Sequence, residues 1–129
     1  MLSTFSRNLL LNWLLTAGAA VRPTAWYISL HIGDPGKTGA NELVIGTDAD
    51  YVRKLAAFGA STLEVSATTG ALTWTADVAA TTYSVTHIGI WDALSGGNFI
   101  LGGALAVPET VVASGSLVLG TGRAIAALT

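Results

Sequence analysis

The sequence has 129 residues, of which 11% are charged, with a formal net charge of −2; we expect a single domain that buries a core of its own. It contains no cysteine, which excludes disulfides, thiolate metal sites and a cysteine nucleophile. Arg53-Lys54 is the only adjacent pair of basic residues, so we do not expect nucleic-acid binding by phosphate neutralisation.

The low charge predicts a protein that assembles with others. Hydrophobic residues make up 51% of the chain, and few surface charges remain to keep monomers apart. We therefore expect part of the surface to be buried against copies of the chain or against other proteins. A monomer coated with threonine and alanine is the alternative interpretation.

Residues 3–17 are predicted to form a helix that Ser3 or Thr4 caps and that Gly18 ends. Apolar residues extend around most of this helix, which favours burial on more than one side. One side is expected to pack on the same domain and another on a neighbouring chain. This division predicts an N-terminal assembly helix over residues 1–18 and a β-domain over residues 19–129. Candidate interface residues on the helix are Phe5, Leu9 and Trp13.

The same N-terminal segment has some features of a secretory signal, with one basic residue, an apolar run and small residues after it. Asn12 and Trp13 interrupt the apolar run, and the run is too short to span a bilayer as a helix. We therefore expect neither a signal peptide nor a membrane partner.

The rest of the chain reads as short strands separated by turn residues. In residues 25–32 the apolar side chains alternate with Tyr27, Ser29 and His31. Further strands are expected at residues 51–58, on both sides of the Thr69-Gly70 turn, and at 85–91, 99–107 and 117–128. This pattern predicts an all-β fold, an antiparallel, jelly-roll-like β-sandwich of six to eight strands that follows an N-terminal α-helix.

Residues for catalysis or metal binding are few. The two histidines, His31 and His87, could bind a metal only with help from scattered acids such as Asp34, Glu42 or Asp92. No paired spacing supports such a site, no serine lies in a nucleophile-elbow pattern, and nothing selects two carboxylates for hydrolysis. We expect no enzyme activity, no metal and no cofactor.

The segment "SLHIGDPGKTGANEL" (residues 29–43) begins as a strand and turns at Asp34-Pro35-Gly36. A long connection to residue 50 follows it, and long connections in compact domains are often exposed or functional. We interpret the segment as a surface loop at the edge of the sheet, in which Asp34 stabilises the turn.

Two segments resemble those of a known family. "SLHIGDPGKTGANEL" followed by "YVR" (residues 51–53) is similar to an "LHTADPG-TG-NE" and "YAR" pair found in small bacteriophage proteins. "VTHIGIWDALSGGNFILGGAL" (residues 85–105) resembles the second characteristic segment of these proteins. Together the segments cover most of the chain. "VIGTDADYVRK" (residues 44–54) departs from the family pattern, which has a shorter, glycine-rich approach to the Tyr-x-Arg.

The family is described as tail-fibre or minor virion proteins, so the resemblance implies a non-enzymatic structural protein of the virion. Its partners would be other virion proteins and copies of itself. Capsid decoration on the phage head is an alternative. A receptor- or carbohydrate-binding module is another, with a host-surface glycan stacked on exposed Trp74, Tyr83 or Trp91. A hydrolase is the third alternative.

Two of the matched residues have roles that physical chemistry suggests. Arg53 is a candidate partner for Glu42 or Asp34, where a charge-assisted hydrogen bond would pin the long loop; a solvated arginine is the alternative. Trp91 lies at the end of a strand and is a candidate either for the core or for an interface anchor.

Overall fold

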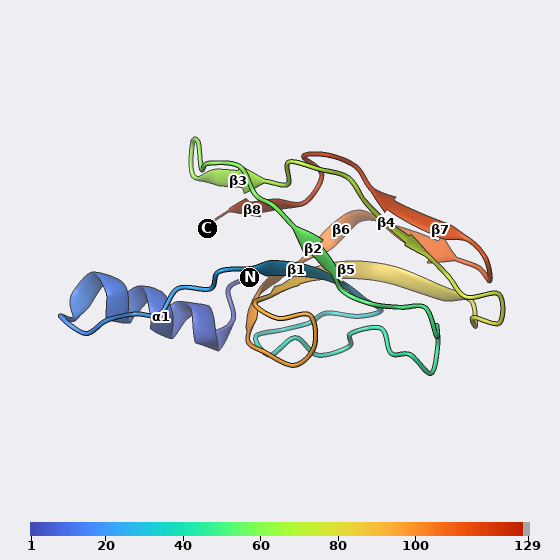
Figure 1. Cartoon of the computed structure of the whole chain (residues 1–129), viewed down its shortest axis with the longest axis horizontal. Coiled ribbons are helices and arrows are strands. Elements are labelled where there is room, and N and C mark those ends of the chain that lie inside the picture. Colours follow the sequence, from blue (N-terminus) through green and yellow to red (C-terminus); the bar gives the residue numbers. More distant parts are fainter. Residues whose placement is uncertain (128–129) are drawn as a thin grey trace.

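A computed structural model describes residues 1–127, which contain one helix and eight strands. Figure 1 shows their arrangement. The elements are α1 (Thr4–Leu15), β1 (Trp26–His31), β2 (Lys54–Ala56), β3 (Val65–Ala67), β4 (Leu72–Thr75), β5 (Tyr83–Trp91), β6 (Phe99–Val111), β7 (Ser116–Leu119) and β8 (Ile125–Ala127). The prediction of a mostly-β, antiparallel fold with an N-terminal helix is confirmed.

Ser3 caps α1, as its sequence position predicts. The Ser3 side chain accepts a hydrogen bond from the backbone N–H of Ser6 at 3.0 Å, which satisfies one of the free donors of the first turn. The helix ends earlier than Ala17, the predicted last residue. Thr16 is extended (φ −124°, ψ 154°), and both its N–H and its hydroxyl donate to the Asn12 carbonyl, at 3.1 Å and 2.7 Å. This β-branched residue therefore closes the helix before Gly18.

The largest sheet has four antiparallel strands in the order β2-β1-β5-β6. Ile28 lies opposite Ile90 and Leu30 opposite Ile88, and directly paired residues present their side chains on the same face. This face is therefore apolar. The alternate residues of β1, Ser29 and His31, point to the other face.

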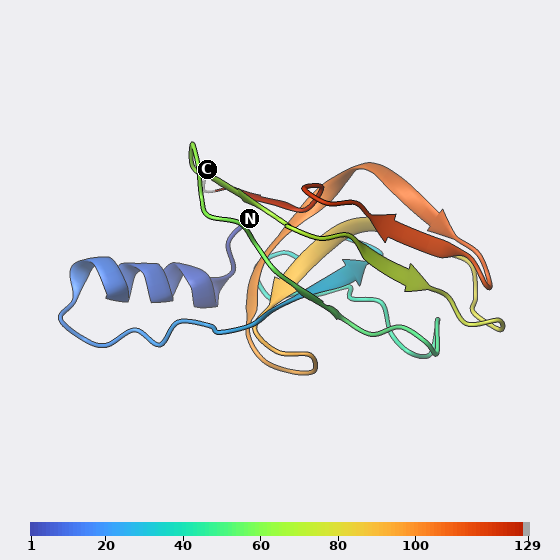
Figure 2. The same ribbon diagram turned by 45° about the horizontal axis from the view of Figure 1, so that its top comes forward.

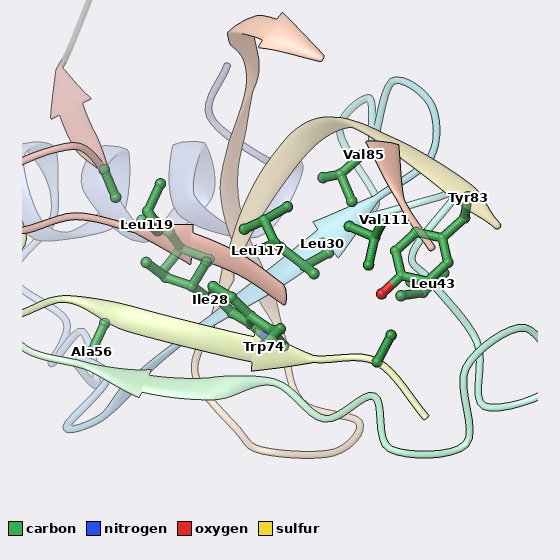
Figure 3. Close-up of a cluster of buried hydrophobic side chains, with 13 residues drawn as sticks. Ile28, Leu30, Leu43, Ala56, Trp74, Tyr83, Val85, Val111, Leu117 and Leu119 are labelled. Carbon is green, nitrogen blue, oxygen red and sulfur yellow. The ribbon is translucent and has the colours of Figure 1, made fainter. Parts of the chain in front are cut away.

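The core lies on the apolar face, beneath the two-stranded β4-β7 sheet. Trp74 of β4 and Leu117 of β7 approach Ile28 and Leu30 of β1 there (Figure 3). A further two-stranded sheet joins β3 to β8. The buried apolar residues of the core cluster are Ile28, Leu30, Leu43, Ala56, Trp74, Ala76, Tyr83, Val85, Ile90, Val111, Leu117, Leu119 and Ala124.

The long loop at residues 32–50 covers the second face of the four-stranded sheet. Its middle returns to β1, where the Leu43 N–H donates to the Leu30 carbonyl at 2.9 Å. Pro35 is fully buried and lies over Gly102 of β6, where an added Cβ would come within 2.6 Å of the proline ring. The segment predicted as an exposed loop is thus partly a cover for the sheet, although Asp34 itself is exposed.

Two of the predicted strand boundaries are wrong. The strand expected at residues 117–128 is two strands, β7 and β8, because a turn closed by a hydrogen bond from Arg123 N–H to the Gly120 carbonyl separates them; Leu128 lies outside the described residues. The strand expected to end at Val107 continues through Pro108 to Val111. Pro108 is tolerated because it lies on the outer strand, at a register shift, where no ladder donor is needed.

α1 projects away from the sheets, and the segment that follows it runs back toward β1 (Figures 1 and 2). Only its start is tied to the domain. Ser3 N–H and the Ser6 hydroxyl both donate to the Ile100 carbonyl, at 2.9 Å and 2.6 Å. The C-terminal half of the helix consequently extends beyond the β-domain.

Candidate functional site

Arg53 is the centre of a polar cluster that joins two loops to the four-stranded sheet. Its side chain is 9% exposed, and its Nε and Nη2 atoms donate to the two carboxylate oxygens of Glu42, both at 2.8 Å. Its Nη1 atom donates to the carbonyls of Ala93 and Gly96, at 2.9 Å and 2.8 Å. One guanidinium therefore links the 32–50 loop to the turn between β5 and β6, in the bidentate geometry that arginine favours.

Trp91 lies beneath this guanidinium. The Arg53 Cζ atom is 3.8 Å from the centroid of the Trp91 ring, within the range of a cation–π interaction. The ring also contacts Phe99, at a centroid separation of 5.1 Å, and its Nε1 atom donates to the Ser29 hydroxyl at 3.0 Å. Trp91 is thus enclosed between a cation and an aromatic ring, and it is only partly exposed.

His31 completes the cluster as a neutral side chain. Its Nδ1 atom lies 2.7 Å from the Ala40 carbonyl, which can only accept, so Nδ1 carries the proton. Its Nε2 atom then accepts from the Ser29 hydroxyl at 2.8 Å. Burial lowers the pKa of His31, and this outweighs the Ala40 hydrogen bond and the Glu42 charge, which raise it. The buried imidazole therefore acts as a neutral link between the sheet and the loop.

Tyr51 secures the inner side of Glu42. Its hydroxyl donates to Glu42 Oε1 at 2.9 Å and accepts from the Leu30 N–H at 3.1 Å. Burial and the adjacent Glu42 carboxylate raise the pKa of Tyr51 well above its usual value. The phenol stays protonated and serves as a donor to the carboxylate.

Asp34 lies apart from Arg53, so of the two predicted acidic partners the structure brings only Glu42 to the arginine. Asp34 Oδ1 accepts from the Gly36 N–H at 2.8 Å, and its carbonyl accepts from Asn41 Nδ2 at 2.8 Å. Its carboxylate is therefore part of the turn, as proposed for it from the sequence alone. Within residues 1–127 no group of three or more potential metal ligands is present.

A second buried carboxylate, which the sequence did not single out, joins the same 32–50 loop to Asp77 and to Tyr83 at the start of β5. Asp48 is 2% exposed. Its Oδ1 atom accepts from the N–H groups of Asp50 and Asp77, at 3.1 Å and 3.0 Å, and its Oδ2 atom accepts from the Tyr83 hydroxyl at 2.7 Å. A buried acid within a loop of several acids gives no sequence signal, because only the fold shows which of them is enclosed.

The comparison with protein families gives a match over residues 1–126, to the family described as podophage GP4 fiber I protein gp80. The chain belongs to this fibre family. It is a phage tail-fibre protein, a non-enzymatic structural component of the virion. A comparison with curated proteins finds no match. Among the residues that the structure describes, no helix is long and apolar enough to cross a membrane.

In this fibre protein the three aromatic rings considered for glycan stacking are not available as a platform. Trp74 and Tyr83 are 3% and 7% exposed. Trp74 Nε1 donates to the Val52 carbonyl at 2.8 Å, and Trp91 is covered by Arg53. Sugar stacking needs an exposed ring face, which these side chains do not present.

Of the three helix residues selected by sequence, only Trp13 is largely exposed. Phe5 and Leu9 are half-buried, whereas Trp13 is 67% exposed. Three leucines that the sequence analysis did not select are also exposed: Leu11 (54%), Leu14 (66%) and Leu15 (76%). The apolar surface is thus concentrated in the part of α1 that projects from the domain. Helical periodicity could not locate it, because the sequence does not show which turns touch the sheet.

Proposed function

We propose that the fibre protein joins its neighbours in the tail through the projecting half of α1. Leu11, Leu14 and Leu15 lie together on one side of the last turn, and Trp13 lies on another side, beside the returning segment; the four side chains are between 54% and 76% exposed. Together they present on the order of 400–500 Å² of apolar surface around the tip of the helix, an amount similar to the largest apolar patch of a typical monomer. Such a patch on a soluble chain is expected to be covered in the assembled state.

The attachment of α1 supports this role. Its first turn is held by Ile100 and by the bridge between Leu2 and Leu101, so the helix is a fixed arm rather than a loose tail. A groove of about 260 Å³, lined by Leu9, Leu10, Trp13, Ala20 and Arg22, lies between the helix and the returning segment. An apolar side chain of a neighbour would fill this groove.

The proposal assigns separate tasks to the two parts of the chain. Residues 1–18 make the contact, and residues 19–129 form the body, in which the β4-β7 sheet over the four-stranded sheet supports a sandwich-like arrangement. The neighbours proposed are copies of the chain and other virion proteins, not nucleic acid or a membrane. Trp91 acts within the body, where it stacks under Arg53, Phe5 supports the base of the arm, and Leu9 lines the groove that the neighbour enters.

Replacing Leu14 and Leu15 together by glutamine tests the proposal. Glutamine keeps the helix propensity of leucine but removes the apolar contact. We expect incorporation of the fibre protein into phage particles to fall at least tenfold, and the oligomer to become smaller by light scattering. The matched control changes Leu63 and Val78, which are 97% and 80% exposed and lie in loops between strands, to glutamine. Normal incorporation of a folded Leu14/Leu15 variant would refute the role of the helix.

A further inference from the structure

β6 is the outer strand of the four-stranded sheet, and only the first part of its free edge is paired. Leu2 forms a bridge with Leu101, and the Gly102 N–H donates to the Met1 carbonyl at 3.1 Å. The Gly102 carbonyl accepts from the amino group of Met1. Beyond Gly102, no strand within residues 1–127 pairs with this edge. In Figure 2, β6 (orange) arches along the margin of the sheet.

The open edge presents free backbone groups. Because Gly102 directs its N–H and carbonyl outward to Met1, Gly103 must direct its own toward Ile88 of β5, and Ala104 must again direct them outward. Neither outward group of Ala104 has a backbone partner among the described residues, and Ala104 is exposed. An unpaired edge of this kind is a template for a strand from another chain.

Charged side chains do not protect the first part of this open edge, which is limited only further on, by the register shift after Ala104 and by Pro108. Residues 103–107 (Gly-Ala-Leu-Ala-Val) include no charged side chain, whereas natural edges are commonly blocked by lysine, proline or a covering loop. Val107 is 68% exposed. Pro108 ends the pairing-competent stretch because it has no N–H. The accessible edge is therefore one short strand in length.

A groove follows this edge on the apolar face of the sheet. It has a volume of about 390 Å³, and its lining includes Ile88, Leu101, Leu105 and Arg123. An atom added at the Cβ position of Gly103 would meet nothing within 4 Å, so the groove is open at this point. In an added strand the residue opposite Gly103 would direct its side chain to the same face, and thus into the groove.

Arg123 gives the groove a positive charge. It is exposed. Within residues 1–127 the one ion pair joins Arg53 to Glu42, so Arg123 forms no ion pair there. A carboxylate on the partner would meet this guanidinium in a bidentate hydrogen-bonded pair.

We propose that β6 is extended, along residues 103–107, by a short extended segment of a different virion protein. The segment carries an apolar side chain that enters the groove beside Gly103 and a carboxylate that pairs with Arg123. Backbone hydrogen bonds to Ala104 supply affinity, and the groove and the arginine supply specificity, as in other cases of strand addition.

A second copy of β6 does not fit this edge. Two copies paired about a two-fold axis at Ala104 would place Ala106 of one opposite Gly102 of the other, and Met1 already occupies that position. An axis placed further along would bring Pro108 into the ladder, where it lacks the donor. The occupant is therefore a separate segment rather than the same strand.

Ala104→Pro is the test, with Ala104→Thr as its matched control. Proline removes the outward N–H, which the fold does not use, whereas threonine keeps it and favours the strand. We expect Ala104→Pro to lower incorporation into phage particles at least tenfold while the isolated chain keeps its melting temperature, and Ala104→Thr to be incorporated normally. Arg123→Glu is expected to lower incorporation several-fold, with a loss that grows at low salt.

Hydrogen exchange provides a second measurement that does not depend on a variant folding. The outward amide of Ala104 should exchange at least tenfold more slowly in the particle than in the isolated chain, whereas the Gly103 amide, which points toward β5 in both states, serves as the internal reference. Equal exchange in both states, normal incorporation of folded Ala104→Pro, or an equal defect in Ala104→Thr would each overturn the proposal. Protection of the Ala104 amide in a concentrated solution of the isolated chain, without particles, would indicate self-association through this edge. That result would also overturn the proposal. Unchanged incorporation of Arg123→Glu would show that the partner segment needs no carboxylate opposite Arg123.

Discussion

His31 and His87, the two histidines of the chain, lie directly opposite each other on β1 and β5. They differ in environment. His31 is fully buried and makes hydrogen bonds through both ring nitrogens. His87 is half-buried, and its Nδ1 atom lies 2.8 Å from the hydroxyl of the adjacent Thr86. The two paired residues therefore have different surroundings, although they lie side by side on the same face of the sheet.

Acidification should destabilise the protein through His31. Burial lowers its folded-state pKa below the ordinary value of 6.5; of the nearby charges, Glu42 opposes this, and His87 and Arg53 add to it. Between these two pKa values the unfolded chain binds more protons than the folded chain, so stability is complete above pH 6.5 and falls as the pH drops toward the folded pKa. Urea unfolding at a series of pH values from 7.5 to 5 measures this loss.

The histidine variants separate this effect from that of the carboxylates. His87→Gln should retain the acid sensitivity, whereas His31→Gln should be less stable at pH 7.5 but show a flatter pH dependence between 7.5 and 5. Both variants should still be incorporated into particles if they fold. An identical pH dependence in wild type and His31→Gln would show that other groups cause the loss.

Arg53→Ala should be among the most destabilising single substitutions of a charged residue. It leaves the Glu42 carboxylate with only the Tyr51 hydroxyl as a donor and two loop carbonyls without one, and breaking a buried pair in this way costs about 3–5 kcal/mol. Arg53→Lys should recover only part of the loss, because an ammonium group cannot match the bidentate geometry or the stack on Trp91. The free energy of unfolding in urea gives both values.

The exposed Arg22→Ala serves as the control for Arg53, with an expected change within about 0.5 kcal/mol. A cost of less than about 1 kcal/mol for Arg53→Ala would mean that the cluster does not hold the loops in place.

Gly39 should not tolerate alanine. Its φ is +80°, and a Cβ there would lie 2.4 Å from Trp91 and 2.9 Å from Phe99. Gly36 has a similar φ of +57°, but a Cβ there would meet nothing within 4 Å. Gly36→Ala should therefore cost only the backbone strain of about 1–2 kcal/mol, and Gly39→Ala considerably more. Thermal unfolding followed by tryptophan fluorescence compares the two; equal costs would show that the ring contact is easily relieved.

Tyr83→Phe should destabilise the protein by about 1.5–3 kcal/mol, the range for a hydrogen bond to a charged group. The change removes the donor to buried Asp48 Oδ2, and burial and this carboxylate already raise the pKa of Tyr83. Tyr27→Phe is the matched control, because no hydrogen bond of the Tyr27 hydroxyl is found within residues 1–127. Chemical denaturation of both variants measures the difference, and similar small losses would argue against a structural role of Asp48.

Alternation and turn chemistry were sufficient to predict most of the fold. The strand around Ile28 and Leu30 shows a clear period of two, and Asp34-Pro35-Gly36 marks its end. The final region was misread because Leu117 to Leu128 is apolar almost throughout, with only short glycine-bearing interruptions. The position of the turn depends on strand pairing, because β7 pairs with β4 whereas β8 pairs with β3.

The candidate sites were harder to predict because their geometry is set by contacts between distant residues. Arg53 could be proposed as a partner for Glu42 or Asp34, but its place above Trp91 depends on the packing of two loops on the sheet. The opposition of His31 and His87, 56 positions apart, follows from strand register. The open edge at Ala104 is likewise a property of the sheet, since a run of small residues looks the same in an inner and an outer strand.

The attachment of α1 through its first turn alone has a consequence for the order of particle construction. The β-domain can complete its folding without the helix tip, and the tip can remain in water until it meets a receiving surface. If α1 makes the contact proposed for it, folding of the body and docking of the tip are two separable events, and an incompletely folded body would hold the tip in the wrong place.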